Sequence, residues 1–201
     1  MKNQAHLYNT QFQQLKNVIL SCSPIEEKEW ELFCQCLSIR SVDKKELLLK
    51  EGEVCQDIYF INKGCLRVFH MQDIREVSRD FYFENAFVSD CVSRLTGTSA
   101  RANIDAIESS EIVCINYATM NSVCDTSFNA QKILRIISEN FLIHFSARIT
   151  SFLIDTPEIR YKNLINENPQ VSQRVPQHYI ASFLGVTPET LSRIRGRIYK
   201  S

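Results

Sequence analysis

Residues 177–196 read QHYIASFLGVTPETLSRIRG, and this stretch has the pattern of two short helices joined by a tight turn. Ala181 is small enough for two steeply crossing helices to touch, and Gly185 can adopt the left-handed geometry of the turn. Thr187 can cap the second helix, with Pro188 at its first position. Apolar residues at helical spacing would lock the pair into one core: Ile180, Leu184, Val186, Leu191 and Ile194. The stretch therefore predicts a helix-turn-helix.

The outward face of the second helix would carry Glu189, Ser192 and Arg193. Such a helix fits the major groove of DNA, with its N-terminal side chains at the base edges. Arg193 can pair bidentately with guanine, and Glu189 can accept from the N4 amino group of cytosine. We expect phosphate contacts from further polar and basic residues, namely Thr187, Thr190, His178, Arg195, Arg197 and Lys200.

The charge distribution supports this interpretation, although the whole chain has a formal net charge of zero. From Arg174 onward there are five basic residues and one acidic residue, a net charge of +4. The first 173 residues carry the other 18 basic and 22 acidic residues, a net charge of −4. A basic tip on an acidic body is typical of a module that binds phosphates.

The segment from about Ile39 to Tyr117 has a different pattern, that of short strands. Turn signals recur about every 8–12 residues between the apolar runs, which indicates an all-β sandwich or roll. Gly52 and Gly64 fall at these turns. The expected strands lie near residues 47–49, 58–61, 65–70, 76–82, 103–107 and 112–115.

Residues 127–153 return to a helical period without Gly or Pro. A near-heptad series gives the candidate residues of a dimer helix, Leu134, Ile137, Phe141, Phe145 and Phe152. Two interpretations compete, because the apolar face of this helix is wide. The helix could pack only on its own β domain, or part of it could form a coiled coil with a second subunit.

The composition excludes several other classes of protein. The chain has no run of 18 apolar residues, which argues against a membrane span, and its polar start is unlike a secretory signal. We therefore expect a cytoplasmic protein without a membrane partner. The sequence contains no motif of a serine hydrolase, zinc protease or phosphate-binding loop, and its four histidines are scattered. We expect no enzyme activity and no metal site.

The eight cysteines lack a C-x-x-C pair, and most lie in apolar runs, where Cys acts as a small buried hydrophobe. Free thiols are expected in a reducing compartment. A redox or metal sensor that uses Cys22, Cys34 and Cys36 is the alternative.

Three segments together resemble the Crp/Fnr family of bacterial transcription regulators: residues 50–53 (KEGE), 58–67 (IYFINKGCLR) and 180–193 (IASFLGVTPETLSR). The similarity covers roughly residues 25–200. It implies an α+β fold with a jelly-roll-like double-stranded β-roll (1–125), a long dimerisation helix (126–154) and a C-terminal winged-helix or helix-turn-helix domain (155–201). With the chain ending at Ser201, residues 160–176 are candidates for the small sheet of a winged helix. Arg160-Tyr161 and Val175-Pro176 resemble the branch common in Bacteroidetes.

The resemblance also implies function. The Glu and Arg of Glu-x-x-Ser-Arg read bases in such regulators, which corresponds to Glu189, Ser192 and Arg193. Homodimers bind pseudo-palindromic DNA, and RNA polymerase is a further expected partner.

The sequence departs from the family at the cyclic-nucleotide cassette. Ser89-Asp90 stands where Gly-Glu would be, and Ala100 stands where the phosphate-binding Arg would fall, with Arg101 one position later. One step along a strand turns a side chain to the opposite face, so Arg101 is expected to point away from the pocket. Arg94 is a second candidate for the anion contact. We therefore expect no cAMP cofactor, although another small-molecule effector or a true cyclic-nucleotide response stays open.

Overall fold

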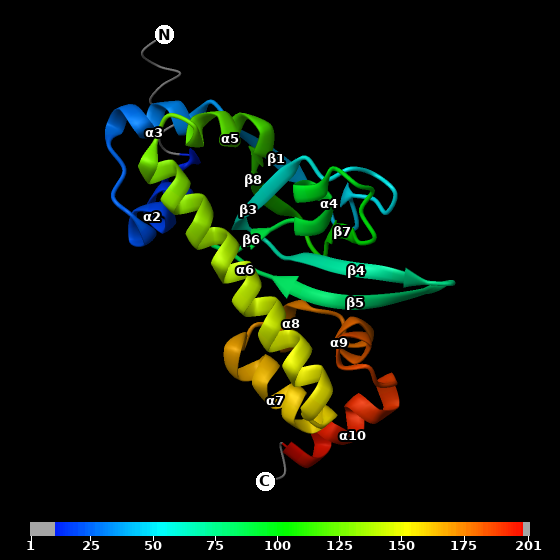
Figure 1. Cartoon of the computed structure of the whole chain (residues 1–201). Coiled ribbons are helices and arrows are strands. Elements are labelled where there is room, and N and C mark those ends of the chain that lie inside the picture. The colour runs from blue at the N-terminus through cyan, green and yellow to red at the C-terminus, as the bar shows by residue number, and fades with distance from the viewer. Residues whose placement is uncertain (1–10, 199–201) are drawn as a thin grey trace.

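The computed structural model describes residues 11–198 (Figure 1). Two antiparallel four-stranded sheets form the β-roll, with strand orders β1-β8-β3-β6 and β2-β7-β4-β5. The strands are β1 (Leu37–Val42), β2 (Leu47–Leu49), β3 (Asp57–Lys63), β4 (Leu66–Gln72), β5 (Arg75–Tyr82), β6 (Phe87–Val88), β7 (Asn103–Ala106) and β8 (Ser110–Asn116). The β-roll predicted from the short apolar runs is thus confirmed.

Alternation along β3 explains why the first sheet is buried on both faces. Tyr59 and Ile61 point into the core between the two sheets, whereas Ile58 and Phe60 point to the opposite face. Helices cover that second face, and Trp30 of these helices is buried in the core between them and the sheet. These helices are α2 (Gln13–Cys22), α3 (Glu27–Cys34), α5 (Tyr117–Cys124) and the N-terminal half of α6 (Phe128–Ile154). A short helix, α4 (Cys91–Thr96), connects β6 to β7.

The long helix α6 runs from the β-roll down to the C-terminal helices (Figure 1). Its 27 residues span about 40 Å. Ser127 caps its N-terminus by accepting a hydrogen bond from the amide of Ala130. None of the helices described between residues 11 and 198 is long and apolar enough to cross a membrane.

Four helices follow α6, namely α7 (Pro157–Glu167), α8 (Val171–Arg174), α9 (Gln177–Leu184) and α10 (Pro188–Ile198). The prediction that residues 160–176 supply the small sheet of a winged helix is wrong. Thr156 caps α7 and Pro157 begins it, and buried Tyr161 and Leu164 give this segment a helical apolar face. Among the residues that the structure describes, no strand follows β8.

Candidate nucleic-acid interface

The helices α9 and α10 form a helix-turn-helix pair around one apolar core. Gly185 ends α9 with φ +69°, the left-handed conformation that the sequence pattern requires. The Val186 amide donates to the Ala181 carbonyl over 3.0 Å, which closes the turn. Residues that face inward are almost fully buried: Ile180, Ala181, Leu184, Leu191 and Ile194. The Thr187 hydroxyl accepts from the Thr190 amide (3.3 Å) at the start of α10.

The outer face of α10 presents the three predicted base-reading residues. Glu189, Ser192 and Arg193 are all exposed, while Leu191 and Ile194 between them are buried. The side-chain hydrogen bond from Thr187 lowers the pKa of Glu189, and Arg193 adds a smaller favourable charge. Glu189 is therefore ionised and able to accept hydrogen bonds at neutral pH.

Thr190 has a role that the sequence did not indicate. Its hydroxyl accepts a hydrogen bond from Nη2 of Arg193 (3.0 Å) and lies 3.3 Å from the hydroxyl of Thr187. The bond to Arg193 lies on the surface of α10 beside the exposed face. Thr190 thus orients the arginine, although the sequence alone placed it among the phosphate contacts.

The other predicted phosphate contacts have different environments. His178 is exposed near the N-terminus of α9, and Arg195 is half-buried. Arg197 is engaged with the protein itself, since its Nη1 donates to Glu158 of α7 over 3.2 Å. Lys200 lies outside the described residues.

The long helix turns the predicted dimer residues toward its own subunit. Ile137 and Phe141 are 5% and 7% exposed in the core beneath the first sheet, and Leu134 and Phe145 pack against that core. For Ile137 and Phe141 the prediction of a dimer seam is wrong, because their side chains are buried against their own subunit, whereas for the half-buried Leu134 and Phe145 it stays a prediction. Phe152 is 53% exposed, and its ring lies 3.3 Å from the position that a Cβ atom added at Gly185 would take.

A second stripe of α6 is exposed instead. It repeats every three or four residues and contains apolar, polar and charged side chains, of which Lys132 is half-buried and the others are exposed: Phe128, Lys132, Arg135, Glu139, Leu142, Ser146, Ile149 and Leu153. Within its C-terminal half, Leu142, Ile149 and Leu153 are 70%, 61% and 78% exposed. Sequence periodicity could not separate the two faces, because α6 carries apolar residues almost all round.

The residues of the cassette are occupied by bonds within the protein. Asp90 caps α4 by accepting from the Ser93 amide, and Ser89 donates to the Asp57 carbonyl. The guanidinium of Arg94 is buried, donates to Ser89 (3.2 Å) and lies 4.2 Å from the ring centre of Tyr117.

The remaining cassette residues do not form an anion site. Ala100 is buried, its methyl side chain cannot bind a phosphate, and its amide donates to the carbonyl of Glu53. Arg101 is exposed on the loop before β7 and does not lie on a strand. Its carbonyl bonds to Nδ1 of His70 over 2.7 Å.

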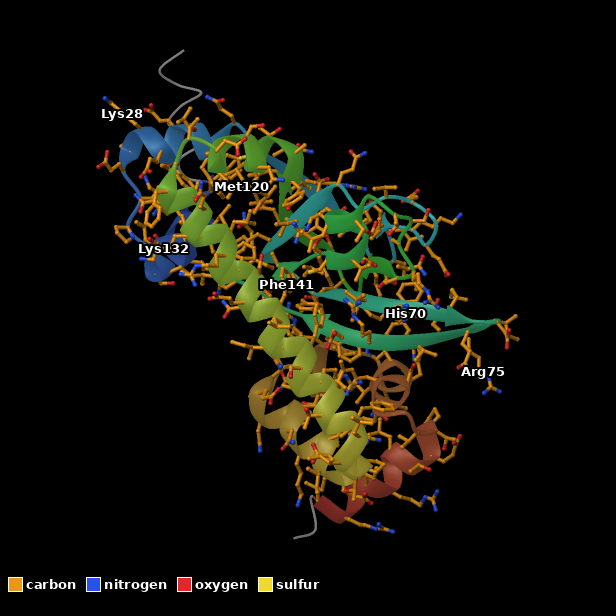
Figure 2. The ribbon with its side chains drawn as sticks, in the orientation of Figure 1. Lys28, His70, Arg75, Met120, Lys132 and Phe141 are labelled. Atoms are coloured by element: carbon orange, nitrogen blue, oxygen red, sulfur yellow. The ribbon has the colours of Figure 1, made fainter. Side chains whose placement is uncertain are left out.

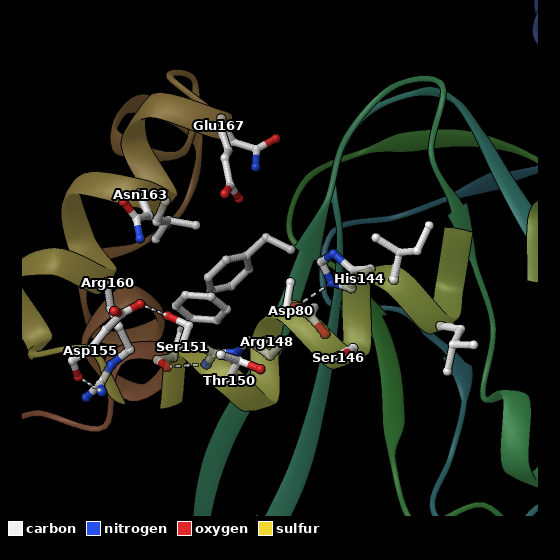
Figure 3. Close-up of a pocket in the computed structure, with 17 residues that line it drawn as sticks. Asp80, His144, Ser146, Arg148, Thr150, Ser151, Asp155, Arg160, Asn163 and Glu167 are labelled. Carbon is white, nitrogen blue, oxygen red and sulfur yellow. Dashed lines mark hydrogen bonds and ion pairs between the residues drawn. The ribbon is translucent and has the colours of Figure 1, made fainter. Parts of the chain in front are cut away.

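A cavity of about 810 Å³ lies where β5, α6 and α7 meet (Figure 3). Asp80 of β5 bonds to Nε2 of His144 on α6 over 3.0 Å, and this bond raises the pKa of His144. Arg148 of α6 donates to the Phe183 carbonyl of α9. The β-roll, the long helix and the helix-turn-helix pair are therefore joined through the wall of this cavity.

Two of the three cysteines of the proposed redox alternative are ill-suited to fast thiolate chemistry. Burial raises the pKa of Cys34 to about 11 and that of Cys36 to about 12, so little thiolate forms at neutral pH. Across residues 11–198, no three His, Cys, Asp or Glu side chains are grouped as metal ligands.

Residues 39–127 match the cyclic nucleotide-binding domain family. A comparison with curated proteins gives no match. Among solved structures, the chain is similar to FixK2 from Bradyrhizobium japonicum, with 17% identity and a TM-score of 0.72 over 82% of this chain and 85% of that one.

Two other solved structures are also similar. A transcriptional regulator of the Crp/Fnr family from Eubacterium rectale has 15% identity and a TM-score of 0.66, over 85% of this chain and 82% of that one. The c-di-GMP responsive regulator CLP from Xanthomonas campestris has 15% identity and a TM-score of 0.63, over 87% and 92%. Residues 39–127 therefore match the cyclic nucleotide-binding domain family, and the chain has the overall fold of these solved structures, one of which is a regulator of the Crp/Fnr family.

Proposed function

We propose that this protein is a cytoplasmic transcription regulator that binds double-stranded DNA through α9 and α10. The observation that carries the proposal is the exposure of Glu189, Ser192 and Arg193 on one face of a helix whose opposite face is locked into a core. A helix held in this way can enter the major groove without unfolding, and its N-terminal side chains then meet base edges. Arg193 recognises guanine, and Glu189 recognises cytosine.

Phosphate contacts hold α10 in register on the duplex. Thr187, His178 and Arg195 are the described residues that serve this role, because they flank the reading face without belonging to it. Arg197 can contact a phosphate only after its ion pair with Glu158 breaks.

The functional unit is a homodimer that pairs the exposed stripe of α6 with the same stripe of a second copy. Three large apolar side chains in the C-terminal half of this stripe are otherwise left in water, namely Leu142, Ile149 and Leu153. The spacing of the stripe alternates between three and four residues, as a parallel coiled coil requires. Such a dimer presents two recognition helices to successive major grooves, about one helical turn apart on a pseudo-palindromic site.

The β-roll of this regulator does not bind cAMP. Ser89 and Asp90 are used as internal hydrogen-bond partners, and the buried Ala100 offers no charge to a cyclic phosphate. A phosphate without its arginine lacks a charge-assisted bond worth roughly 1.5–3 kcal/mol. Titration calorimetry with cAMP and cGMP tests this point, and clear heat at micromolar concentration would contradict it.

A cyclic-nucleotide-responsive regulator is the second candidate, and Arg94 is the observation that favours it. Its side chain is buried in the cassette, and its Nη1 has no hydrogen-bond partner. An anionic ligand that reached this nitrogen would bind there. Arg94→Met would then abolish the heat of binding in the same calorimetric experiment.

DNA selection on the purified full-length protein tests the proposed function. We expect enrichment of a pseudo-palindromic duplex from a random library. Arg193→Ala should weaken binding to that duplex by roughly 1–3 kcal/mol and relax its specificity, whereas Arg195→Ala should weaken binding to all duplexes alike. Equal losses on selected and random duplexes for Arg193→Ala would contradict base reading by this residue.

A further inference from the structure

The cavity between β5, α6 and α7 is lined by two arginines that have no acidic partner. Arg148 of α6 donates through Nη2 to the carbonyl of Phe183, and Arg160 of α7 donates through Nη2 to the carbonyl of Leu184. Both carbonyls belong to the last turn of α9, the negative end of its dipole. Within residues 11–198, neither guanidinium forms an ion pair with a carboxylate. Two positive charges on this wall are therefore balanced only by backbone dipoles.

The two guanidinium groups keep unused hydrogen-bonding capacity. Nε and Nη1 of Arg148 have no partner among the described residues, and Nε of Arg160 is buried without one. Burial lowers the pKa of Arg148; the charge of Asp80 opposes this shift, and the charge of Arg160 adds to it. The two arginines thus lie close enough to repel each other, and an anion placed beside both would relieve that repulsion.

The acidic side chains of the same wall limit the charge of such an anion. Asp80 is bonded to His144 at 3.0 Å, and Asp155 accepts a hydrogen bond from Ser151 at 2.6 Å. Glu167 also lines the cavity and is exposed. A doubly charged phosphate would be repelled by these three carboxylates, so a singly charged carboxylate fits the wall better.

The rest of the wall favours an apolar ligand body. Phe81, Leu164 and Phe183 line the cavity and are each at most 8% exposed. Ile143 also lines it but is 66% exposed, although this residue belongs to neither the subunit core nor the stripe of α6. A volume of about 810 Å³ lies within the range of small-molecule sites, which combine apolar walls with a few polar groups.

The charged end of the cavity lies on the face of α6 that a dimer leaves free. Beyond Phe141, α6 leaves the core beneath the first sheet and runs beside the C-terminal helices (Figure 2). His144 and Arg148 lie one turn apart and follow Leu142 and Ser146 of the stripe by two residues each, about 200° around the helix. Leu142 and Ser146 border the cavity as well. A second copy on the stripe therefore narrows the opening and leaves the arginines accessible.

We propose that this cavity binds an amphipathic monocarboxylic acid, with its carboxylate between Arg148 and Arg160 and its apolar body against the buried aromatic and leucine side chains. Nη1 of Arg148 donates to the carboxylate, and the terminal nitrogens of Arg160 each keep a second hydrogen for it. The body of the ligand covers Ile143. The inference does not depend on the proposed binding of DNA.

Calorimetric titration of the full-length protein with decanoate and with cinnamate tests the ligand class. We expect saturable binding of at least one acid. The neutral alcohols decanol and cinnamyl alcohol have the same bodies without the charge and should bind roughly ten- to hundredfold more weakly. Acetate has the charge without the body and should give no heat at the same concentration. Equal affinities for acid and alcohol, or no saturable binding of either acid at millimolar concentration, would overturn the proposal.

Two variants of the protein place the ligand in the cavity. Ala147 lines the cavity and is exposed, so Ala147→Trp fills the space without disturbing the core and should weaken binding of the acid about tenfold or more. Ala118→Trp, at an exposed position of α5, is the matched control. Arg148→Met should reduce the affinity for the acid to that for the alcohol, whereas Arg135→Met on the same helix should not. Unchanged affinity in both cavity variants would refute the site.

The methyl resonances of three isoleucines show where the acid binds. Ile143 borders the cavity, Ile149 lies on the stripe, and Ile74 lies in the turn between β4 and β5. Binding in the cavity should shift the resonance of Ile143 and leave those of the other two unchanged. A shift at Ile149 without one at Ile143 would place the apolar body on the stripe and sink the proposal. None of these measurements uses DNA, so their outcome is separate from that of the proposed function.

Discussion

Replacing Ile149 by alanine should dissociate the homodimer without unfolding the subunit. Ile149 is 61% exposed in the middle of the free stripe of α6. The substitution removes about three carbon atoms, worth about 0.8 kcal/mol each when fully buried. Scaled by the exposed fraction of Ile149, the loss of dimerisation free energy is about 1.5 kcal/mol per helix and about 3 kcal/mol per dimer. The dissociation constant should therefore rise by more than about 100-fold.

Sedimentation equilibrium across a range of concentrations measures this shift directly. Ile74→Ala is the matched control, because Ile74 is 93% exposed at the tip of the β4–β5 hairpin and lies off the stripe. Phe141→Ala should instead destabilise the subunit itself, because it opens a cavity in the core. We expect it to cost about 3–5 kcal/mol of unfolding free energy. A folded Ile149→Ala protein that dimerises as tightly as the wild type would refute the assignment of the stripe.

Three further outcomes are expected. Thr190→Val should lower the preference for the selected duplex over random DNA several-fold, because Arg193 loses its hydrogen-bond acceptor, and Thr190→Ser should restore it in competition binding. The bond to Asp80 raises the pKa of His144, so protonated His144 stabilises the folded state. This stabilisation is complete below the pKa of His144 in the unfolded chain, about 6.5, and is lost as the pH rises through its pKa in the folded protein. The stability advantage over His144→Gln in urea titrations should shrink between pH 5.5 and 8.5, and a constant difference would contradict this. Gly64→Ala should cost at least about 2 kcal/mol in the same assay, because φ is +108° and the new Cβ would meet the backbone of β8.

Local patterns determined a large part of this protein. The turn at Gly185, the cap at Thr187 and the buried positions Leu191 and Ile194 could all be assigned from spacing, because a helix-turn-helix is built from neighbours in the chain. The β-roll could be predicted for a similar reason, since each short strand carries its own alternation and its own turn. The absence of an arginine at Ala100 is likewise visible in the sequence.

Tertiary packing decided what spacing could not. The sequence placed Ile137 and Phe141 in a dimer seam, but α6 is apolar on several sides, and only its contact with the β-roll determines which side stays free. Residues 160–176 form helices, and not the expected small sheet, because their apolar face packs against α9.

The partners of Ser182 and Arg174 lie far away in the sequence, on β5 and on the loops beside the β-roll. Periodicity within a segment reports which residues share a face, but it carries no information about what that face meets. The sequence by itself therefore determined the helix-turn-helix pair, whereas only the folded chain determined which other elements that pair contacts.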